Sequence, residues 1–152
     1  IRDLATDIPA ILNNLQVFEK PVMVMPGVVA LQANKFVNYK TAIEEMELLN
    51  KQCLSHTKAL QQLAFLIICD DTDFVCKSLN NFLWATFTRC NPSHDMHGID
   101  SFTENKHWGC KGPLIFDARI KPHHAPPLEK NDTIEKRVDR LFEKGGSLYK
   151  LA

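Results

Sequence analysis

The chain has 152 residues, its 18 Lys and Arg balance 18 Asp and Glu, and 45% of its residues are apolar. This length supports one domain with a core of its own, and the apolar content argues against a disordered chain. The zero net charge is not that of a nucleic-acid-binding domain, and without eighteen consecutive apolar residues we expect no membrane span.

The cysteines bear on the compartment in which the protein works. They are odd in number and three lie within apolar stretches, whereas secreted disulfide frameworks usually have an even number in a shorter chain. We therefore expect reduced thiols in the core of a cytoplasmic protein. No signal peptide opens the chain and its first residue is Ile rather than Met, from which we expect a processed or excised piece.

Helical and strand-like patterns alternate through the first half of the chain. Residues 4–15 have helical apolar spacing, with a proline in the first turn, and residues 42–53 form a second helical stripe. Residues 21–31 predict two short buried strands, or one strand broken at Pro26. Residues 63–69 are apolar without alternation, which is typical of a central strand buried on both faces.

The second half continues the same alternation. Residues 77–89 fit a helix, and residues 113–116 fit a short strand. We expect loops at residues 94–112 and 121–131, the second of which is rich in Pro and His. The apolar side of the predicted helix consists of Leu79, Phe82, Leu83 and Thr86, and Trp84 lies between these positions, which indicates a core or interface residue.

A further helix is predicted near the end of the chain. Asp132, with Glu135 three residues later, has the form of an N-terminal cap, although Ser or Thr is usual there. An apolar face runs to Phe142, and Gly145 and Gly146 end the helix. The whole pattern predicts an α/β fold: a three-layer domain with a mixed, largely parallel sheet flanked by helices, plus a C-terminal helix and apolar tail.

Three carboxylates directly follow the predicted central strand. Asp70, Asp71 and Asp73 are placed where open α/β sheets hold ligands, so one or two of them are candidates for a cation or a polar substrate. A strand-to-helix turn also needs Asp as a cap, and the sequence favours this interpretation. Arg89, near the end of the next helix, is expected to form a structural ion pair with one of these carboxylates.

Other chemistry-bearing residues form no familiar motif. His94, His97, His107 and Cys110 have spacings that zinc sites use in principle, but scattered surface histidines are the favoured interpretation. Phosphate-binding glycine loops and the Gly-x-Ser-x-Gly nucleophile motif do not occur, and no cysteine has a sequence context that would activate its thiol.

Two segments together resemble the C-terminal part of UbiD-like decarboxylases, the 3-octaprenyl-4-hydroxybenzoate carboxy-lyases. Residues 66–74 read Leu-Ile-Ile-Cys-Asp-Asp-Thr-Asp-Phe, and residues 82–92 read Phe-Leu-Trp-Ala-Thr-Phe-Thr-Arg-Cys-Asn-Pro. In that family an apolar strand ends in an Asp-Asp-x-Asp turn and leads to a helix carrying Leu-Trp-Ala and Thr-Arg. Asp95 fits the acidic residue that follows, and residues 109–118 are similar to a Gly-x-Lys segment that enters a strand ending in Asp-Ala. The resemblance extends from residue 22 to the end.

The resemblance implies reversible decarboxylation of an aromatic, hydroxylated carboxylic acid. By extrapolation from the family, this reaction would belong to ubiquinone or menaquinone biosynthesis. The family uses prenylated FMN with a divalent metal and a monovalent cation. That cofactor and the catalytic residues belong to a preceding flavin-binding domain that nothing in this chain matches. Residues 1–152 are therefore expected to be a single C-terminal domain. The domain is expected to be inactive alone, with no bound cofactor or metal and no catalytic residue of its own.

The resemblance also implies roles for particular residues by their position. As candidates for the wall of the substrate pocket it gives Phe102, Glu104, Asn105, Lys106, His107, Trp108, Ser55 and His56. As its structural motif it gives Asp70, Asp71, Asp73, Trp84, Arg89, Asp95, Lys111 and Asp117. Its partners would be the flavin domain and further copies of the chain, reached through the C-terminal helix and the tail of Leu148, Tyr149 and Leu151.

Two alternatives remain open at this point. The first alternative is that the chain is a non-catalytic structural or oligomerisation domain of α/β fold. The remaining possibility is a small zinc-binding module built on the four His and Cys residues named above.

Overall fold

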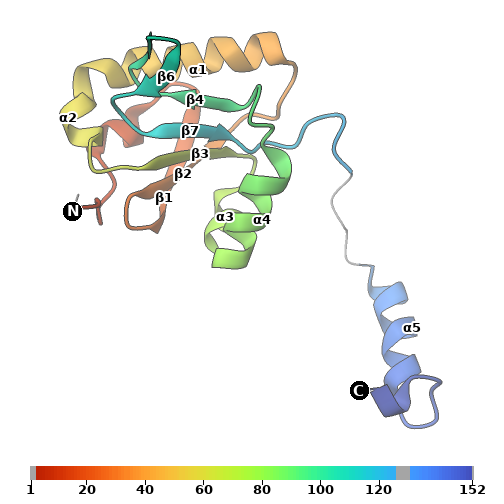
Figure 1. The fold of residues 1–152 in the computed structure, drawn as a ribbon. Coiled ribbons are helices and arrows are strands. Elements are labelled where there is room, and N and C mark those ends of the chain that lie inside the picture. The colour runs from red at the N-terminus through yellow and green to blue at the C-terminus, as the bar shows by residue number, and fades with distance from the viewer. Residues whose placement is uncertain (1–2, 126–130, 152) are drawn as a thin grey trace.

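In the computed structural model, which describes residues 3–125 and 131–151, five strands form one sheet in the order β1-β2-β3-β7-β4 (Figure 1). A separate two-stranded sheet consists of β5 (Ser101–Glu104) and β6 (His107–Cys110). The strands of the main sheet are β1 (Phe18–Met25), β2 (Val28–Ala33), β3 (Phe65–Cys69), β4 (Met96–Gly98) and β7 (Leu114–Asp117).

The central strands of the main sheet are parallel and its edges are antiparallel. β3 pairs in parallel with β2 and with β7, while β1 pairs antiparallel with β2 and β4 pairs antiparallel with β7. This arrangement confirms the mixed α/β sheet. The carboxyl ends of β3 and β7 meet at one edge, where the register pairs Ile68 with Asp117.

Helices cover both faces of the sheet, which confirms three layers (Figure 1). α1 (Tyr39–Cys53), the short η2 (Leu54–His56) and α2 (Thr57–Leu60) lie on one face, and α3 (Thr72–Cys76) and α4 (Leu79–Arg89) on the other. Because side chains alternate along β3, Leu66 and Ile68 pack with the α1 residues Met46 and Leu49, whereas Ile67 packs with Phe82 of α4.

The first strand pair resolves the ambiguity at residues 21–31 in favour of two strands. β1 and β2 form a hairpin, and Gly27 in its turn has a φ of 79°, which a residue with a side chain rarely adopts. The predicted helix at residues 4–15 is wrong, because only the 3-10 helix η1 (Ala10–Asn14) forms there. Pro9 explains this difference, since its ring disfavours the helical conformation at the preceding residue, and the helical turn starts only after it.

The buried face of α4 differs from the predicted one. The structure buries Phe82, Ala85 and Thr86, whereas Leu79 and Leu83 are exposed. The sheet covers only a narrow strip of this helix, so part of its apolar surface remains free. Trp84 is 49% exposed, and its prediction as a core residue is therefore wrong.

The predicted loop at residues 94–112 is also wrong, because β4, β5 and β6 all lie within it. These strands are short, and the two hairpin strands are largely exposed, so the apolar alternation that marks a strand is weak. Asn105 and Lys106 turn the β5–β6 hairpin with φ values of 49° and 65°, the positive values that tight two-residue hairpin turns require.

The C-terminal helix forms as α5 (Asp132–Phe142), although its cap is one residue earlier than predicted. Oδ1 of Asn131, not Asp132, accepts hydrogen bonds from the N–H groups of Thr133 and Ile134. The chain leaves the helix before Gly145, whose φ is 94°, and ends in η3 (Tyr149–Leu151). In the predicted loop at 121–131, residues 126–130 lie outside the described residues.

Candidate functional site

The acidic turn after β3 is a helix cap. Oδ1 of Asp71 accepts hydrogen bonds from the N–H groups of Asp73 (2.9 Å) and Phe74 (3.1 Å) at the start of α3. Asp70 accepts a hydrogen bond from the N–H of Ile120 (2.8 Å) and forms an ion pair with Arg89 at 3.6 Å. The predicted cap and the predicted ion pair are both confirmed, and two of the three carboxylates already have partners in the protein.

Replacing Asp71 with Ala is expected to lower the free energy of unfolding by about 1 kcal/mol, because two N–H groups of α3 lose their acceptor. Chemical denaturation of the variant measures this loss. Asp73→Ala is the matched control, since Asp73 is exposed and its side chain caps no helix. Equal stability of the two variants would contradict the assignment of Asp71 as the cap.

At the adjacent carboxyl end of β7, buried ionic side chains form a second feature. Nε and Nη2 of Arg119 donate to the two carboxylate oxygens of Asp117 at 2.9 and 2.7 Å, and both side chains are about 1% exposed. Nη1 of Arg119 donates to Glu45 of α1 at 2.6 Å. The paired carboxylates raise the pKa of Arg119 although burial opposes them.

A buried lysine extends this group toward the loop before β4. Nζ of Lys121 lies 3.2 Å from Oδ2 of Asp95 and donates to the backbone oxygen of Asp117 at 2.7 Å. Asp95 also accepts a hydrogen bond from the N–H of Asn91 at 2.7 Å. We call Glu45, Asp95, Asp117, Arg119 and Lys121 the buried charge cluster.

The buried charge cluster fixes the point at which the chain leaves the sheet. It ties α1, the turn at Asn91, the end of β7 and the segment leading toward α5 into one network. Sequence reasoning singled out Asp95 and Asp117 as structural but missed their partners. The signal that was present is a charged residue at every second position, 117, 119 and 121, at the end of an apolar strand.

The cysteines have no activated thiol. All five are free, and Cys53 and Cys69 are buried, as expected for core thiols. Burial raises the pKa of Cys53 and of Cys90 to about 11 and that of Cys69 to about 12. These thiols therefore remain protonated near neutral pH and are poor nucleophiles.

The histidines of the proposed zinc set lie in different surroundings. His94 contacts the ring of Tyr39 at 5.3 Å between centroids, and His107 is exposed on β6. Sγ of Cys110 donates to the backbone oxygen of Gly112 at 3.2 Å. Across residues 3–125 and 131–151, no three His, Cys, Asp or Glu side chains are grouped so as to hold a metal ion, so nothing there supports the zinc alternative.

The pocket-wall candidates separate into two places. Phe102, Glu104, Asn105, Lys106, His107 and Trp108 lie on the β5–β6 hairpin and are exposed. Ser55 and His56 lie in η2, with Oγ of Ser55 2.9 Å from Nδ1 of His56. Of the eight, only Trp108 lines the cleft described next.

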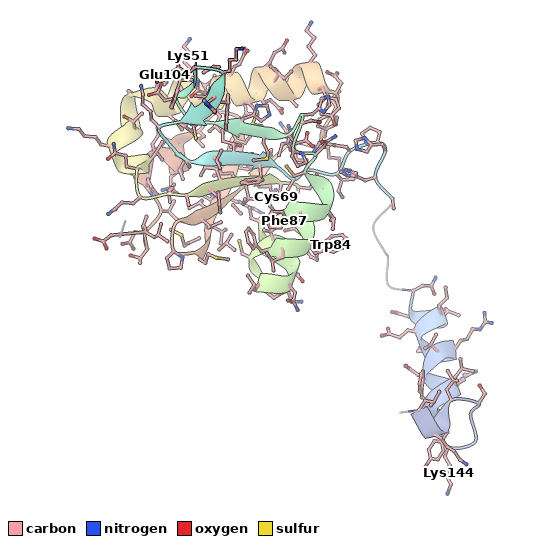
Figure 2. All side chains as sticks on the ribbon, in the orientation of Figure 1. Lys51, Cys69, Trp84, Phe87, Glu104 and Lys144 are labelled. Atoms are coloured by element: carbon pink, nitrogen blue, oxygen red, sulfur yellow. The ribbon has the colours of Figure 1, made fainter. Side chains whose placement is uncertain are left out.

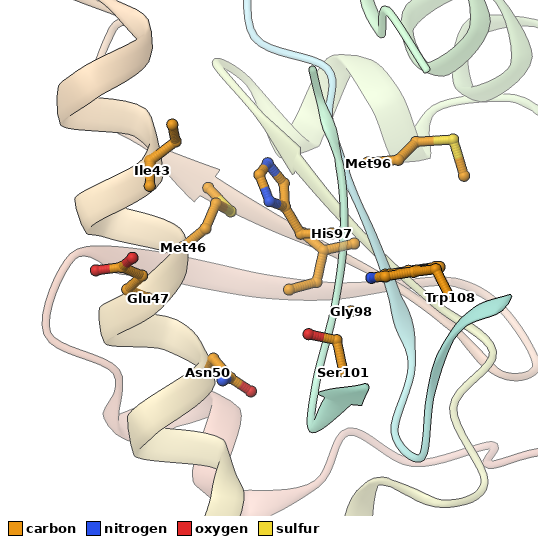
Figure 3. Close-up of a pocket in the computed structure, with 10 residues that line it drawn as sticks. Ile43, Met46, Glu47, Asn50, Met96, His97, Gly98, Ser101 and Trp108 are labelled. Atoms are coloured by element: carbon orange, nitrogen blue, oxygen red, sulfur yellow. The ribbon is translucent and has the colours of Figure 1, made fainter. Parts of the chain in front are cut away.

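This cleft, of about 210 Å³, lies between α1, β4 and the hairpin (Figure 3). Ile43, Met46, Glu47 and Asn50 line it from α1. Its other walls come from β4, β7 and the hairpin, through Met96, His97, Gly98, Ser101, Trp108 and Ile115. The sequence indicates His97 only as a candidate zinc ligand and favours a surface position for it, whereas His97 is half-buried and faces α1.

Gly98 allows the hairpin to lie against β4. A Cβ atom at Gly98 would come within 2.5 Å of Cβ of Cys110 and 3.2 Å of Cη2 of Trp108. Replacing Gly98 with Ala is therefore expected to displace the hairpin and to cost about 1–3 kcal/mol of stability. Trp108 fluorescence and thermal unfolding measure both effects. An unchanged emission spectrum and an unchanged Tm would contradict this contact.

The outer side of α4 presents exposed apolar side chains. Trp84 and Phe87 lie on this helix (Figure 2), and Trp84 contacts Phe74 at 5.9 Å between ring centroids. Arg89 stacks over the Trp84 ring at 4.8 Å. The interface role predicted for Trp84 stays a prediction.

α5 carries a second exposed apolar side, and Figure 1 shows the helix away from the sheet. No residue of the described helix is buried, and its apolar members are Ile134, Val138, Leu141 and Phe142.

Elsewhere, Lys111 forms an exposed ion pair with Asp100 at 3.2 Å. No helix among the described residues is long and apolar enough to cross a membrane.

Three comparisons relate this chain to known proteins. The model of the 3-octaprenyl-4-hydroxybenzoate carboxy-lyase C-terminal domain matches residues 20–106, more than half of the chain. A 4-hydroxybenzoate decarboxylase subunit of Chlamydia pneumoniae is 29% identical over 89 residues, which are 59% of this chain and 15% of that protein. An uncharacterized protein of Chlamydia muridarum is 27% identical over 105 residues, 69% of this chain and 18% of that protein.

Among solved structures, the vanillic acid decarboxylase of Sedimentibacter hydroxybenzoicus in its open form is 16% identical, with a TM-score of 0.44. The alignment covers 78% of this chain and 27% of that one.

The chain thus spans less than a fifth of the length of these two chlamydial relatives. The family match begins near the start of the resemblance in the sequence and includes the acidic turn, α4 and Asp95. It ends before the Gly-x-Lys segment at residues 109–118. Because the match spans more than half of the chain, this protein belongs to the family of the 3-octaprenyl-4-hydroxybenzoate carboxy-lyase (UbiD) C-terminal domain.

Proposed function

We propose that this chain serves as the C-terminal domain of a UbiD-like decarboxylase that acts reversibly on an aromatic, hydroxylated carboxylic acid. The family match across residues 20–106 is the observation that carries this proposal. The substrate class agrees with the name of the chlamydial relative, a 4-hydroxybenzoate decarboxylase subunit. The five free cysteines are compatible with a cytoplasmic enzyme, which is the location we propose.

The chemistry is assigned to a flavin-binding domain outside this chain. Prenylated FMN, a divalent metal and a monovalent cation need phosphate-binding and carboxylate groups around them. The described residues provide no group of three metal-binding side chains, and the acidic turn is used for capping and for ion pairing. These residues do not fit the cofactor, and we derive no catalytic step from them.

The contribution proposed for this domain is part of the wall of the substrate pocket. The β5–β6 hairpin projects polar and aromatic side chains, among them Lys106 and His107, and is held to the sheet edge by the contact of Trp108 with Gly98. A two-residue turn with positive φ values keeps the hairpin short and defined. Packed against a flavin domain, this hairpin would restrict which aromatic acids enter.

The second proposed contribution is self-association through α5 and the tail. The exposed Val138 and Leu141 of α5 and Leu151 of η3 form apolar surface that a chain in water usually covers. A second copy of the chain is the proposed occupant, which gives a homo-oligomer.

An assay of carbon dioxide release tests the function. The 152-residue chain is incubated with 4-hydroxybenzoate alone, and then together with a flavin-binding portion of the chlamydial decarboxylase loaded with prenylated FMN. We expect no release by the chain alone and release only when both parts are present. Release that is independent of this chain would contradict its proposed role as a required domain.

A further inference from the structure

The cleft beside the hairpin combines apolar walls with hydrogen-bonding groups that have no partner. Met46 of α1 and the Trp108 indole face it from different elements, and Figure 3 shows the His97 ring directed toward α1 beside Met46. Neither the His97 ring nor the Ser101 hydroxyl has a hydrogen-bond partner among the described residues. The cleft can therefore supply these groups to a ligand.

The volume of the cleft fits one aromatic ring. About 210 Å³ exceeds the roughly 150 Å³ cavity that holds benzene in another protein, and lies below the volumes typical of sites for drug-sized ligands. The Trp108 indole favours an aromatic neighbour, and the thioether of Met46 favours contact with a ring edge.

The polar groups select the substituent on that ring. Burial lowers the pKa of His97, against the opposing effect of Asp117 and Asp95, so the ring is neutral near pH 7 and keeps one acceptor nitrogen. The charged group in the lining is the Glu47 carboxylate, which repels an acid and accepts from a donor. A neutral hydroxyl satisfies these groups better than a carboxylate does.

We propose that this cleft binds the hydroxyl-bearing side of a phenol, with His97 as the hydrogen-bond acceptor and Trp108 as the aromatic wall. This inference rests on the proposed function, in which the same hairpin borders the substrate pocket, and it adds a site that recognises the ring hydroxyl. The carboxyl group would then point away from Glu47, toward the opening of the cleft. His97 acts here as a specificity residue and takes no part in the reaction.

NMR titration of the 152-residue chain tests the site with three probes: phenol, anisole and benzoate. The Trp108 indole N–H and the His97 ring protons are the reporters. We expect phenol to shift both signals in a saturable manner, and we expect anisole, which lacks the donor, and benzoate to bind at least fivefold more weakly. Equal affinity for phenol and anisole, or no shift of either reporter, would overturn the proposal.

Variants separate recognition from folding. His97→Phe keeps a ring but removes the acceptor, and should reduce phenol affinity at least fivefold, to the level of anisole. His97→Gln restores an acceptor oxygen and should recover part of that loss, while His123→Phe, in the exposed segment after β7 and away from the cleft, should change nothing. If His97→Phe does not fold, the anisole comparison on the unmodified chain still decides the outcome. Because flavin is absent, a failure here would leave the carbon dioxide assay, and thus the proposed function, unaffected.

Discussion

Replacing Lys121 with Met is expected to cost about 3–5 kcal/mol of folding free energy, because the change leaves buried carboxylate charge without its cation. Lys121 and Asp95 are each about 1% exposed, and their side chains lie 3.2 Å apart. The lost ammonium group also donates to three backbone oxygens, those of Arg89, Asp117 and Arg119. Since domains of this size are stable by about 5–15 kcal/mol, such a loss brings the chain near to unfolding.

Urea denaturation measures the loss, with Lys111→Met as the matched control. The control removes the same charge from an exposed ion pair with Asp100, and pairs of this kind contribute about 0–1 kcal/mol. Equal effects of the two substitutions would contradict the role of the buried charge cluster in holding α1, β7 and the chain beyond β7 together.

Placing Asp at both Val138 and Leu141 is expected to convert the proposed oligomer into a monomer. Both side chains lie on the exposed apolar side of α5, and burying two carboxylates in an apolar contact is strongly unfavourable. We expect self-association to weaken by at least tenfold, measured by light scattering across a dilution series. The stability of the sheet should not change, since no residue of the described α5 is buried.

Lys136→Asp is the control for this experiment. Residue 136 lies on the opposite side of the helix from Val138 and Leu141, so the added charge remains in water. A monomer for the unmodified chain, or an equal loss of association in the control, would contradict docking through the apolar side of α5.

Local patterns explain the parts of the fold that were predicted correctly. β3 is five apolar residues, of which the last four are buried, and the Asp that caps α3 follows it, so each of these features acts within a few residues. The same holds for α1, where apolar positions at helical spacing face the sheet. The acidic turn with the Leu-Trp-Ala helix was also specific enough to identify the family before any contact was known.

Features that depend on distant contacts were missed. Arg119 meets Glu45 across 74 positions of sequence, and a buried Lys121 has no local signal because lysine is almost always exposed. The exposed hairpin lacks apolar alternation, so its sequence predicts a loop rather than strands. The cleft at His97 arises because residues of α1 and β4, far apart in the sequence, line the same space, which spacing along the chain cannot reveal.

The assignment of this chain as a decarboxylase domain is tested by placing its family-matching segment inside an active enzyme. Residues 20–106 replace the matching segment of the 4-hydroxybenzoate decarboxylase subunit from Chlamydia pneumoniae, and carbon dioxide release is measured with the prenylated flavin bound. We expect turnover by the hybrid and none by the 152-residue chain alone. A folded, flavin-loaded hybrid that releases no carbon dioxide, or turnover of 4-hydroxybenzoate by the isolated chain without flavin, would contradict the assignment.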